Sequence, residues 1–201
     1  MFVLPDYIIC EQIHENSRIN IYRGYTARHR VPVIIKALKK EAANSIGISR
    51  LIHEYEITRN LNIEGIIKAI RLEQAGSFFA LIMEDIGAVS LRKYMQDHPV
   101  SLQNFLDIAV HLTEVLGRLH QKGIIHRDLK PENILIHPSM GKVYIIDFSS
   151  AELFPAESKN TLLSNNPAGT LEYMSPEQTG RLNIGIDQRS DLYSLGVIFY
   201  E

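Results

Sequence analysis

The chain has 201 residues, of which 45% are hydrophobic and 22% are charged, and its formal net charge at pH 7 is −2. This composition is that of an ordinary globular protein, and the charge gives no case for nucleic-acid binding. Cys10 is the single cysteine, so an intrachain disulfide is excluded and a reducing, cytoplasmic compartment fits. No apolar run is long enough to span a bilayer, and the first residues do not resemble a signal peptide.

The first third of the chain predicts a strand meander. Residues 7–9, 19–22 and 31–35 are rich in β-formers and are separated by polar segments. Lys36 ends the third run, where a lysine alone indicates no more than a solvated strand end. The apolar run 78–83 is too short for most helices and predicts a buried strand.

A helix is predicted between these strands, over residues 48–61, because apolar residues recur there at near-helical spacing. Two carboxylates, Glu54 and Glu56, lie on this helix. They point about 200° apart around its axis, so only one of them can face a given side chain of the sheet.

Two further helices are predicted after residue 89, and each begins behind a serine cap. Ser90 precedes a short helix, and Ser101 precedes a longer one that ends at Gly123. We expect the longer helix to be the main packing helix of its region, because it carries an apolar stripe. The stripe consists of Leu102, Phe105, Leu106, Ala109, Leu112, Val115, Leu116 and Leu119.

The stretch 126–133, His-Arg-Asp-Leu-Lys-Pro-Glu-Asn, concentrates polar chemistry between apolar runs. The runs 134–136 and 143–146 flank a turn signal, which predicts a hairpin with polar groups at its ends. A carboxylate base, a lysine and two oxygen ligands for a hard cation are what phosphoryl transfer needs. We expect these groups to meet at one rim of the hairpin: Asp128, Lys130, Asn133 and Asp147.

The stretch 126–133 matches the catalytic loop of protein kinases at every defined position, and the sequence is identified as resembling a eukaryotic-type Ser/Thr protein kinase domain. This resemblance implies an α+β, bilobal fold. It implies a small antiparallel β lobe with one key helix over about residues 1–86, including the hinge. A mainly helical, incomplete lobe follows over about residues 87–201, and ATP with Mg²⁺ binds between the two lobes.

Within the larger lobe, the resemblance assigns the catalytic roles. Asp128 accepts or orients the proton of the substrate hydroxyl, and Asn133 and Asp147 hold the metal ions. Lys130 contacts the transferred phosphate and, together with Thr170, favours Ser/Thr over Tyr as acceptor.

Within the smaller lobe, the resemblance assigns ATP-binding residues. Lys36 contacts the α- and β-phosphates, and Glu54 is selected over a surface role as the partner of that lysine. Met83 is the gatekeeper behind the adenine, a role that is compatible with simple core packing. Backbone groups of Glu84 and Ile86 hydrogen-bond the base.

Regulation and support are assigned in the same way. In this family a residue in the position of Arg127 commonly pairs with a phosphate on the activation segment. We therefore expect activity to depend on loop phosphorylation, because a cation beside the base needs a counter-charge. Asp191 anchors the backbone of the catalytic loop from below, caps its own helix, or does both. Glu177 is assigned a structural supporting role as well. The candidate acceptors in the activation segment are Ser158, Thr161 and Ser164, while Thr170 serves the site itself.

Three departures from the family pattern stand out. The three glycines of the phosphate loop fall at His14, Asn16 and Ile19, and Ser149 replaces the glycine after Asp147-Phe148. The family's last helices, and the arginine that usually pairs with Glu177, are not in the sequence. We therefore expect a C-terminally truncated domain, either a fragment of a longer polypeptide or a truncated gene product. The glycine-free loop, the intact catalytic loop and the run Ser175-Pro176-Glu177-Gln178 together resemble the N-terminal kinase domains of large bacterial multidomain sensor proteins.

The expected function is ATP-dependent phosphoryl transfer to Ser/Thr hydroxyls of protein substrates in signalling. The alternative is a catalytically weak or inactive kinase-fold module that binds nucleotide or partner domains within a larger signalling protein. A small-molecule phosphotransferase is a third option, which the segment 169–177 argues against because it resembles a peptide-docking platform. Expected partners are a protein substrate and further domains of the same polypeptide.

Overall fold

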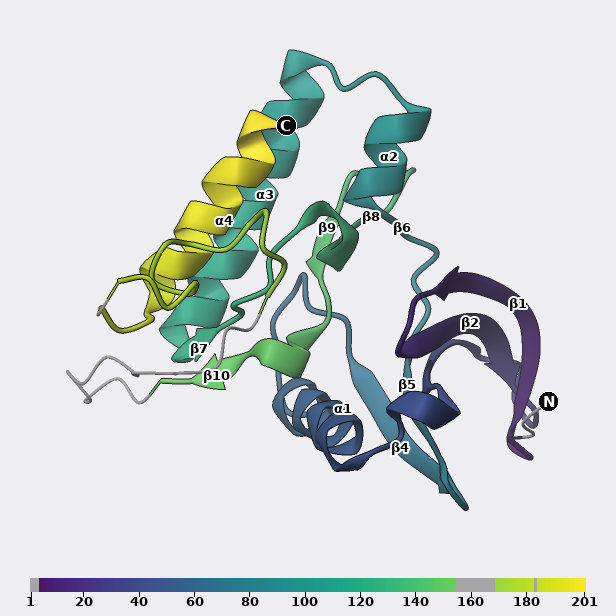
Figure 1. Cartoon of the computed structure of the whole chain (residues 1–201). Helices are drawn as coiled ribbons and strands as arrows, with labels where there is room; N and C mark the ends of the chain where they lie inside the picture. The colour runs from purple at the N-terminus through teal and green to yellow at the C-terminus, as the bar shows by residue number, and fades with distance from the viewer. Residues whose placement is uncertain (1–3, 155–168, 183) are drawn as a thin grey trace. The chain divides into compact units, whose positions relative to one another are not determined.

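The structure is a computed structural model that describes residues 4–154, 169–182 and 184–201 (Figure 1). It divides into two compact units. Unit 1 comprises Met1–Leu61 and Ile67–Gly87, and unit 2 comprises Asn62–Ile66 and Ala88–Glu201. The first unit ends one residue beyond the boundary expected from the sequence, and the segment 62–66 belongs to the second unit.

Unit 1 is built on one antiparallel sheet of five strands in the order β1-β2-β3-β5-β4. The strands are β1 (Tyr7–Glu15), β2 (Ile19–Thr26), β3 (Pro32–Leu38), β4 (Ala69–Ala75) and β5 (Phe78–Glu84). The predicted strands are thus present and longer than the sequence indicated. The strand β4 was not predicted as such, because its residues alternate weakly and most of them are exposed.

The core of the sheet follows from the period of two along β3 and β5. Val33, Ile35 and Ala37 of β3 lie in one cluster with Ala80 and Ile82 of β5, and each is at most 1% exposed. Since successive side chains alternate between faces, the residue between Ile35 and Ala37 belongs to the opposite face of β3. That residue is Lys36.

The helix α1 (Ser45–Thr58) begins behind Asn44, whose side chain accepts a hydrogen bond from the Gly47 N–H at 3.0 Å. It follows the short 3₁₀ helix η1 (Lys40–Ala42). The predicted helix over 48–61 was therefore about one turn late at each end. Asn44 is the signal that could have placed its start, because asparagine is among the favoured N-cap residues.

Unit 2 carries three helices, α2 (Leu91–Asp97), α3 (Leu102–Gln121) and α4 (Gln188–Tyr200), among its described residues. Its strands are short: β6 (Val89–Ser90), β7 (Ile124–Ile125), β8 (Ile134–Ile136), β9 (Val143–Ile145) and β10 (Glu152–Leu153). The strands β6, β8 and β9 form one antiparallel sheet, and β7 pairs with β10. Two 3₁₀ turns, η2 (Pro131–Asn133) and η3 (Phe148–Ser150), lie at the hairpin ends.

Both predicted serine caps are present. The Ser90 hydroxyl accepts from the Lys93 N–H at 3.2 Å, and the Ser101 hydroxyl accepts from the Asn104 N–H at 3.1 Å. The helix α3 ends at Gln121, and the predicted Gly123 follows its C-cap Lys122 with a φ of +70°, which suits glycine.

The apolar stripe of α3 is buried only in its C-terminal two thirds. Ile108, Leu112, Val115, Leu116 and Leu119 are buried, whereas Leu102 and Leu106, which we expected to pack, are 74% and 46% exposed. The helices α3 and α4 lie side by side (Figure 1), joined by an edge contact between the rings of Phe105 and Phe199. Within the described part of the chain, no helix is long and apolar enough to cross a membrane.

Candidate active site

The stretch 126–133 leaves β7, turns through η2 and continues directly into β8. Pro131 opens η2, where its fixed φ and missing N–H cost nothing. Ile134 of β8 pairs with Ile145 of β9, so the predicted hairpin is present. This pairing brings the end of β9 back to the start of β8 and fixes one rim of the hairpin.

Asp128 is surrounded at this rim by hydrogen-bond donors. The Asn133 Nδ2 donates to the Asp128 carbonyl at 2.8 Å and to its Oδ2 at 3.3 Å. The Lys130 Nζ lies 3.3 Å from the same Oδ2. The Thr170 hydroxyl donates to Asp128 Oδ1 at 3.0 Å and accepts from the Lys130 Nζ at 2.7 Å. These contacts therefore fix the orientation of the Asp128 carboxylate.

Asp147 follows β9 and has a left-handed backbone with φ of +66°. The preceding N–H, that of Ile146, donates to the Asn133 carbonyl at 3.0 Å, so the backbones at Asp147 and Asn133 are neighbours. Since the Asn133 Nδ2 is engaged with Asp128, the amide oxygen is the atom that a cation can use. An amide oxygen and a carboxylate are a donor set that suits Mg²⁺, which takes few protein ligands and completes its shell with phosphates and water.

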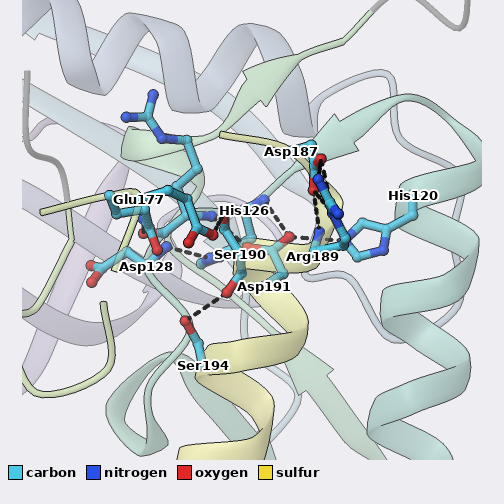
Figure 2. A network of polar contacts seen from close by, with 11 residues as sticks. His120, His126, Asp128, Glu177, Asp187, Arg189, Ser190, Asp191 and Ser194 are labelled. Atoms are coloured by element: carbon cyan, nitrogen blue, oxygen red, sulfur yellow. Dashed lines mark hydrogen bonds and ion pairs between the residues drawn. The ribbon is translucent and has the colours of Figure 1, made fainter. Parts of the chain in front are cut away.

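A buried carboxylate on α4 holds the backbone of the loop from behind (Figure 2). Asp191 is fully buried, and its oxygens accept from the N–H groups of His126 at 2.9 Å and Arg127 at 2.8 Å. The His120 Nε2 lies 2.8 Å from the same carboxylate. The helix cap is a different residue, Asp187, so of the two predicted roles for Asp191 only the anchoring one applies.

Glu177 also contacts α4 (Figure 2). Its Oε1 accepts from the Ser190 hydroxyl at 2.6 Å. Burial alone raises the pKa of the Glu177 carboxyl, but hydrogen bonds from Ser175 and Ser190 outweigh it and hold this pKa below its ordinary value. A serine thus takes part in holding Glu177, where the family pattern led us to look for an arginine.

In unit 1, the predicted ion pair between β3 and α1 is present. The Lys36 Nζ lies 2.7 Å from Glu54 Oε2, and the two side chains are 7% and 3% exposed. Lys36 lies inside β3 rather than at its end, so the interpretation as a solvated strand end is wrong. Buried charges need a partner, and the pair satisfies both.

The end of β5 carries the residues expected at the hinge. Met83 is buried in the sheet, and the Glu84 N–H already donates to the Lys68 carbonyl at 3.2 Å. The Glu84 carboxylate accepts from the Lys68 N–H at 2.9 Å. An adenine ring that hydrogen-bonds to the Glu84 backbone must therefore use the Glu84 carbonyl, unless the hydrogen bonds between Glu84 and Lys68 break. Ile86 follows as a half-buried residue.

The comparison with known sequences agrees with this arrangement. The profile of the protein kinase domain matches residues 11–201, nearly the whole chain. The chain belongs to the protein kinase family. Protein kinases use ATP with Mg²⁺.

Individual relatives of this kinase support the same conclusion. A probable serine/threonine-protein kinase PknB of Lactococcus lactis is 31% identical over 97% of the chain and 31% of its own length. The serine/threonine-protein kinase PrkC of Bacillus subtilis is 30% identical over 97% of the chain and 30% of its own length. The serine/threonine-protein kinase ULK3 of Xenopus laevis is 28% identical over 98% of the chain and 42% of its own length. The chain spans less than half the length of these relatives.

One premise about the kinase site needs correction. We expected Arg127 to be an unpaired cation unless a phosphate on the activation segment paired with it. The Arg127 guanidinium instead contacts the Glu152 carboxylate of β10. This pair could not be predicted, because β10 is only two residues long and its residues do not stand out by strand propensity. The candidate acceptors Ser158, Thr161 and Ser164 lie outside the described residues.

A second residue that sequence reasoning missed is Gln178. It is 2% exposed, and its Nε2 donates to the Arg127 carbonyl at 2.8 Å. Its Oε1 accepts from both the N–H and the hydroxyl of Ser175 at 3.2 Å. The segment after the activation loop is thereby tied to the catalytic loop, with Gly169 approaching the same Arg127 carbonyl so closely that a Cβ would lie 2.8 Å away.

The turn between β1 and β2, which lacks the expected glycines, is organised by Asn16. Its Oδ1 accepts from the N–H groups of Arg18 at 2.8 Å and Ile19 at 2.9 Å. Asparagine commonly closes turns through such side-chain bonds. Of the described non-glycine residues, those with positive φ are Arg30, Arg127 and Asp147, so this turn does not need glycine's conformational freedom.

Proposed function

We propose that this kinase domain transfers the γ-phosphoryl group of ATP to serine or threonine hydroxyls of proteins. The observation that carries the proposal is the continuous contact from Lys130 through Thr170 to Asp128, with Asn133 on the other side of the carboxylate. The base Asp128, the cation Lys130 and the metal ligand Asn133 thus lie close together in the stretch 126–133. The names of the relatives from Lactococcus lactis and Bacillus subtilis support the same reaction.

In this proposal Asp128 orients the attacking hydroxyl and accepts its proton. The carboxylate is held by Asn133 and Thr170, so the oxygen that meets the hydroxyl is in place before substrate arrives. Lys130 lies beside the same oxygens and offsets negative charge on the phosphoryl group as it moves. Bound Mg²⁺–ATP supplies the phosphoryl group and part of the neutralising charge, and Asn133 and Asp147 hold the metal.

Unit 1 contributes the nucleotide contacts in this proposal. Lys36, oriented by Glu54, binds the α- and β-phosphates, because a buried pair presents the ammonium with little loss of side-chain entropy. Met83 packs against the adenine, and the backbone of Glu84 and Ile86 recognises its edge. For Glu84 the carbonyl is the recognising atom, since its N–H is engaged with Lys68.

The test is a labelling experiment with the full-length protein. It is incubated with γ-labelled ATP, Mg²⁺ and a mixture of peptides that carry serine, threonine or tyrosine, and the labelled amino acids are identified. We expect phosphoserine and phosphothreonine. Tight ATP binding without any transfer to peptide or to the protein itself would instead support the alternative, a nucleotide-binding module. Labelled tyrosine alone would contradict the roles of Lys130 and Thr170.

A further inference from the structure

Arg127, the residue before the proposed base, is held at three points by three different segments. Its N–H donates to Asp191 of α4, its carbonyl accepts from Gln178, and its guanidinium contacts Glu152 of β10. Its backbone φ is +67°, a conformation that a residue with a side chain adopts only when its surroundings impose it. The conformation of the loop at Asp128 therefore depends on these contacts.

The contact with Glu152 differs from the other two because it neutralises the charge of the guanidinium. The Arg127 side chain is 3% exposed, and a guanidinium cannot be buried at that level without an opposite charge. The Glu152 side chain as a whole is 29% exposed, although its Oε2 is buried and its Oε1 faces the guanidinium.

The backbone fixes the position of this carboxylate. Glu152 pairs with Ile125 in the ladder between β10 and β7, and β7 runs directly into His126 and Arg127. The Phe154 N–H continues the contact by donating to the Gly123 carbonyl at 2.5 Å. The counter-charge of Arg127 thus belongs to a strand that is registered on the same segment as the arginine.

We propose that Glu152 is a positioning residue, whose carboxylate is the resident counter-charge of Arg127 and holds the catalytic loop in its working conformation without a phosphate on the activation segment. The proposal rests on the proposed function, in which Asp128 is the base. A loop phosphate that approached Arg127 would meet the negative charge of Glu152 and would have to displace it. Loop phosphorylation is therefore unnecessary for basal activity.

The experiment compares phosphatase-treated full-length proteins by their kcat and KM for ATP and a serine peptide. We expect treatment to leave the wild-type kcat unchanged. Glu152→Gln, which keeps shape and removes charge, should lower kcat about 10- to 100-fold, as a small misplacement of a reacting group does. The KM for ATP should not change, and Glu152→Asp should retain most of the activity.

Two controls separate positioning from general damage. Glu114→Gln removes the charge of an exposed pair with Arg118 on α3, and should leave kcat unchanged. Acetate, added to Glu152→Ala, should restore kcat in part, because the Glu152 side chain is partly exposed and its site can be reached from solvent. A circular dichroism spectrum like that of the wild type should accompany each variant.

The outcomes are distinct from those that test the function itself. An inactive wild type, or equal activity of wild type and Asp128→Asn, contradicts the proposed function. An active wild type that phosphatase treatment inactivates overturns the role of Glu152. Full activity of Glu152→Gln overturns it as well, and so does a loss in Glu152→Ala that acetate does not reduce at any concentration.

Discussion

The catalytic loop over 126–133 and the turn between β1 and β2 are both parts that the family uses to handle phosphate, yet they are built in opposite ways. Contacts from distant segments hold the loop, since Asp191, Thr170 and Gln178 each contact a loop residue at least 42 positions earlier in the chain. The turn is held locally, by the Asn16 side chain and its neighbours two and three residues on.

The two ways of building a site differ in which of their residues can be replaced. A network of distant partners fails if any member is lost, because each loss leaves a buried group unsatisfied. A local turn can exchange one device for another, here an asparagine side chain for glycine flexibility. The exchange has a chemical consequence, since two N–H groups of the turn are now engaged with Asn16.

The largest effect is expected at the centre of the loop's network. Asp191→Ala removes the acceptor of two buried N–H groups and of His120, and should cost about 3–5 kcal/mol of local stability. Hydrogen exchange of the amides at His126 and Arg127 should then accelerate, with loss of activity. Asp187→Ala at the start of the same helix removes the cap and an ion pair with the exposed Arg189, and should cost about 1–2 kcal/mol. Equal effects of the two variants would contradict the anchoring role.

The buried pair of unit 1 allows stability and function to be separated. Lys36→Met should lower activity by about 10²-fold or more, and should destabilise unit 1 by about 3–5 kcal/mol because Glu54 remains buried without this partner. The double variant Lys36→Met/Glu54→Leu should regain the stability but not the activity. Hydrogen exchange across β3 and α1 measures the first, and the transfer rate measures the second. Recovered activity in the double variant would exclude Lys36 from phosphate binding.

The turn between β1 and β2 should tolerate substitution, and one substitution there should strengthen ATP binding. Asn16→Gly releases the N–H groups of Arg18 and Ile19 and adds backbone freedom, so the KM for ATP should fall about 2- to 10-fold, the value of one net hydrogen bond. Ser17→Gly adds glycine to the same turn but keeps Asn16, and should leave KM unchanged. The comparison between loop and turn breaks if both variants lower KM equally.

The smallest effect is a pH dependence at Glu177. Its pKa lies below the ordinary 4.5, so its ionised form stabilises the fold above that value, and this contribution is lost as pH falls through the lowered pKa. Ser190→Ala removes a hydrogen bond to the ionised form and should raise the pKa toward 4.5. The variant should be less stable than wild type at neutral pH and equal to it once Glu177 is protonated. Carbon-13 NMR titration of the carboxyl measures the shift, and an unchanged pKa would contradict it.

Much of the architecture could be predicted because short-range sequence patterns determine it. The caps Ser90 and Ser101, the strand 78–83 and the hairpin after the catalytic loop each have a short-range signal, and the structure has them all. The pair of Lys36 and Glu54 was also predictable, since helical spacing and the family pattern left one carboxylate that faces the lysine.

What could not be predicted depends on distant contacts or on a neighbour that no pattern marks. The pairing of Glu152 with Arg127 needs a two-residue strand whose register is set by β7. The burial of Lys36 inside β3 depends on α1 packing over that face of the sheet. The exposure of Leu102 on α3 depends on which elements reach the start of the helix, and periodicity alone predicts only that an apolar face exists.

We propose above that Asp128 is the base of this protein kinase domain. The most direct test is a single-turnover measurement of phosphoryl transfer from Mg²⁺–ATP to a serine peptide, by the full-length protein and by its Asp128→Asn variant. Asn keeps the shape and cannot accept the proton, so the transfer rate should fall by about 10²- to 10⁴-fold with ATP affinity unchanged. Equal transfer rates for the two proteins would contradict the role of Asp128 as the base.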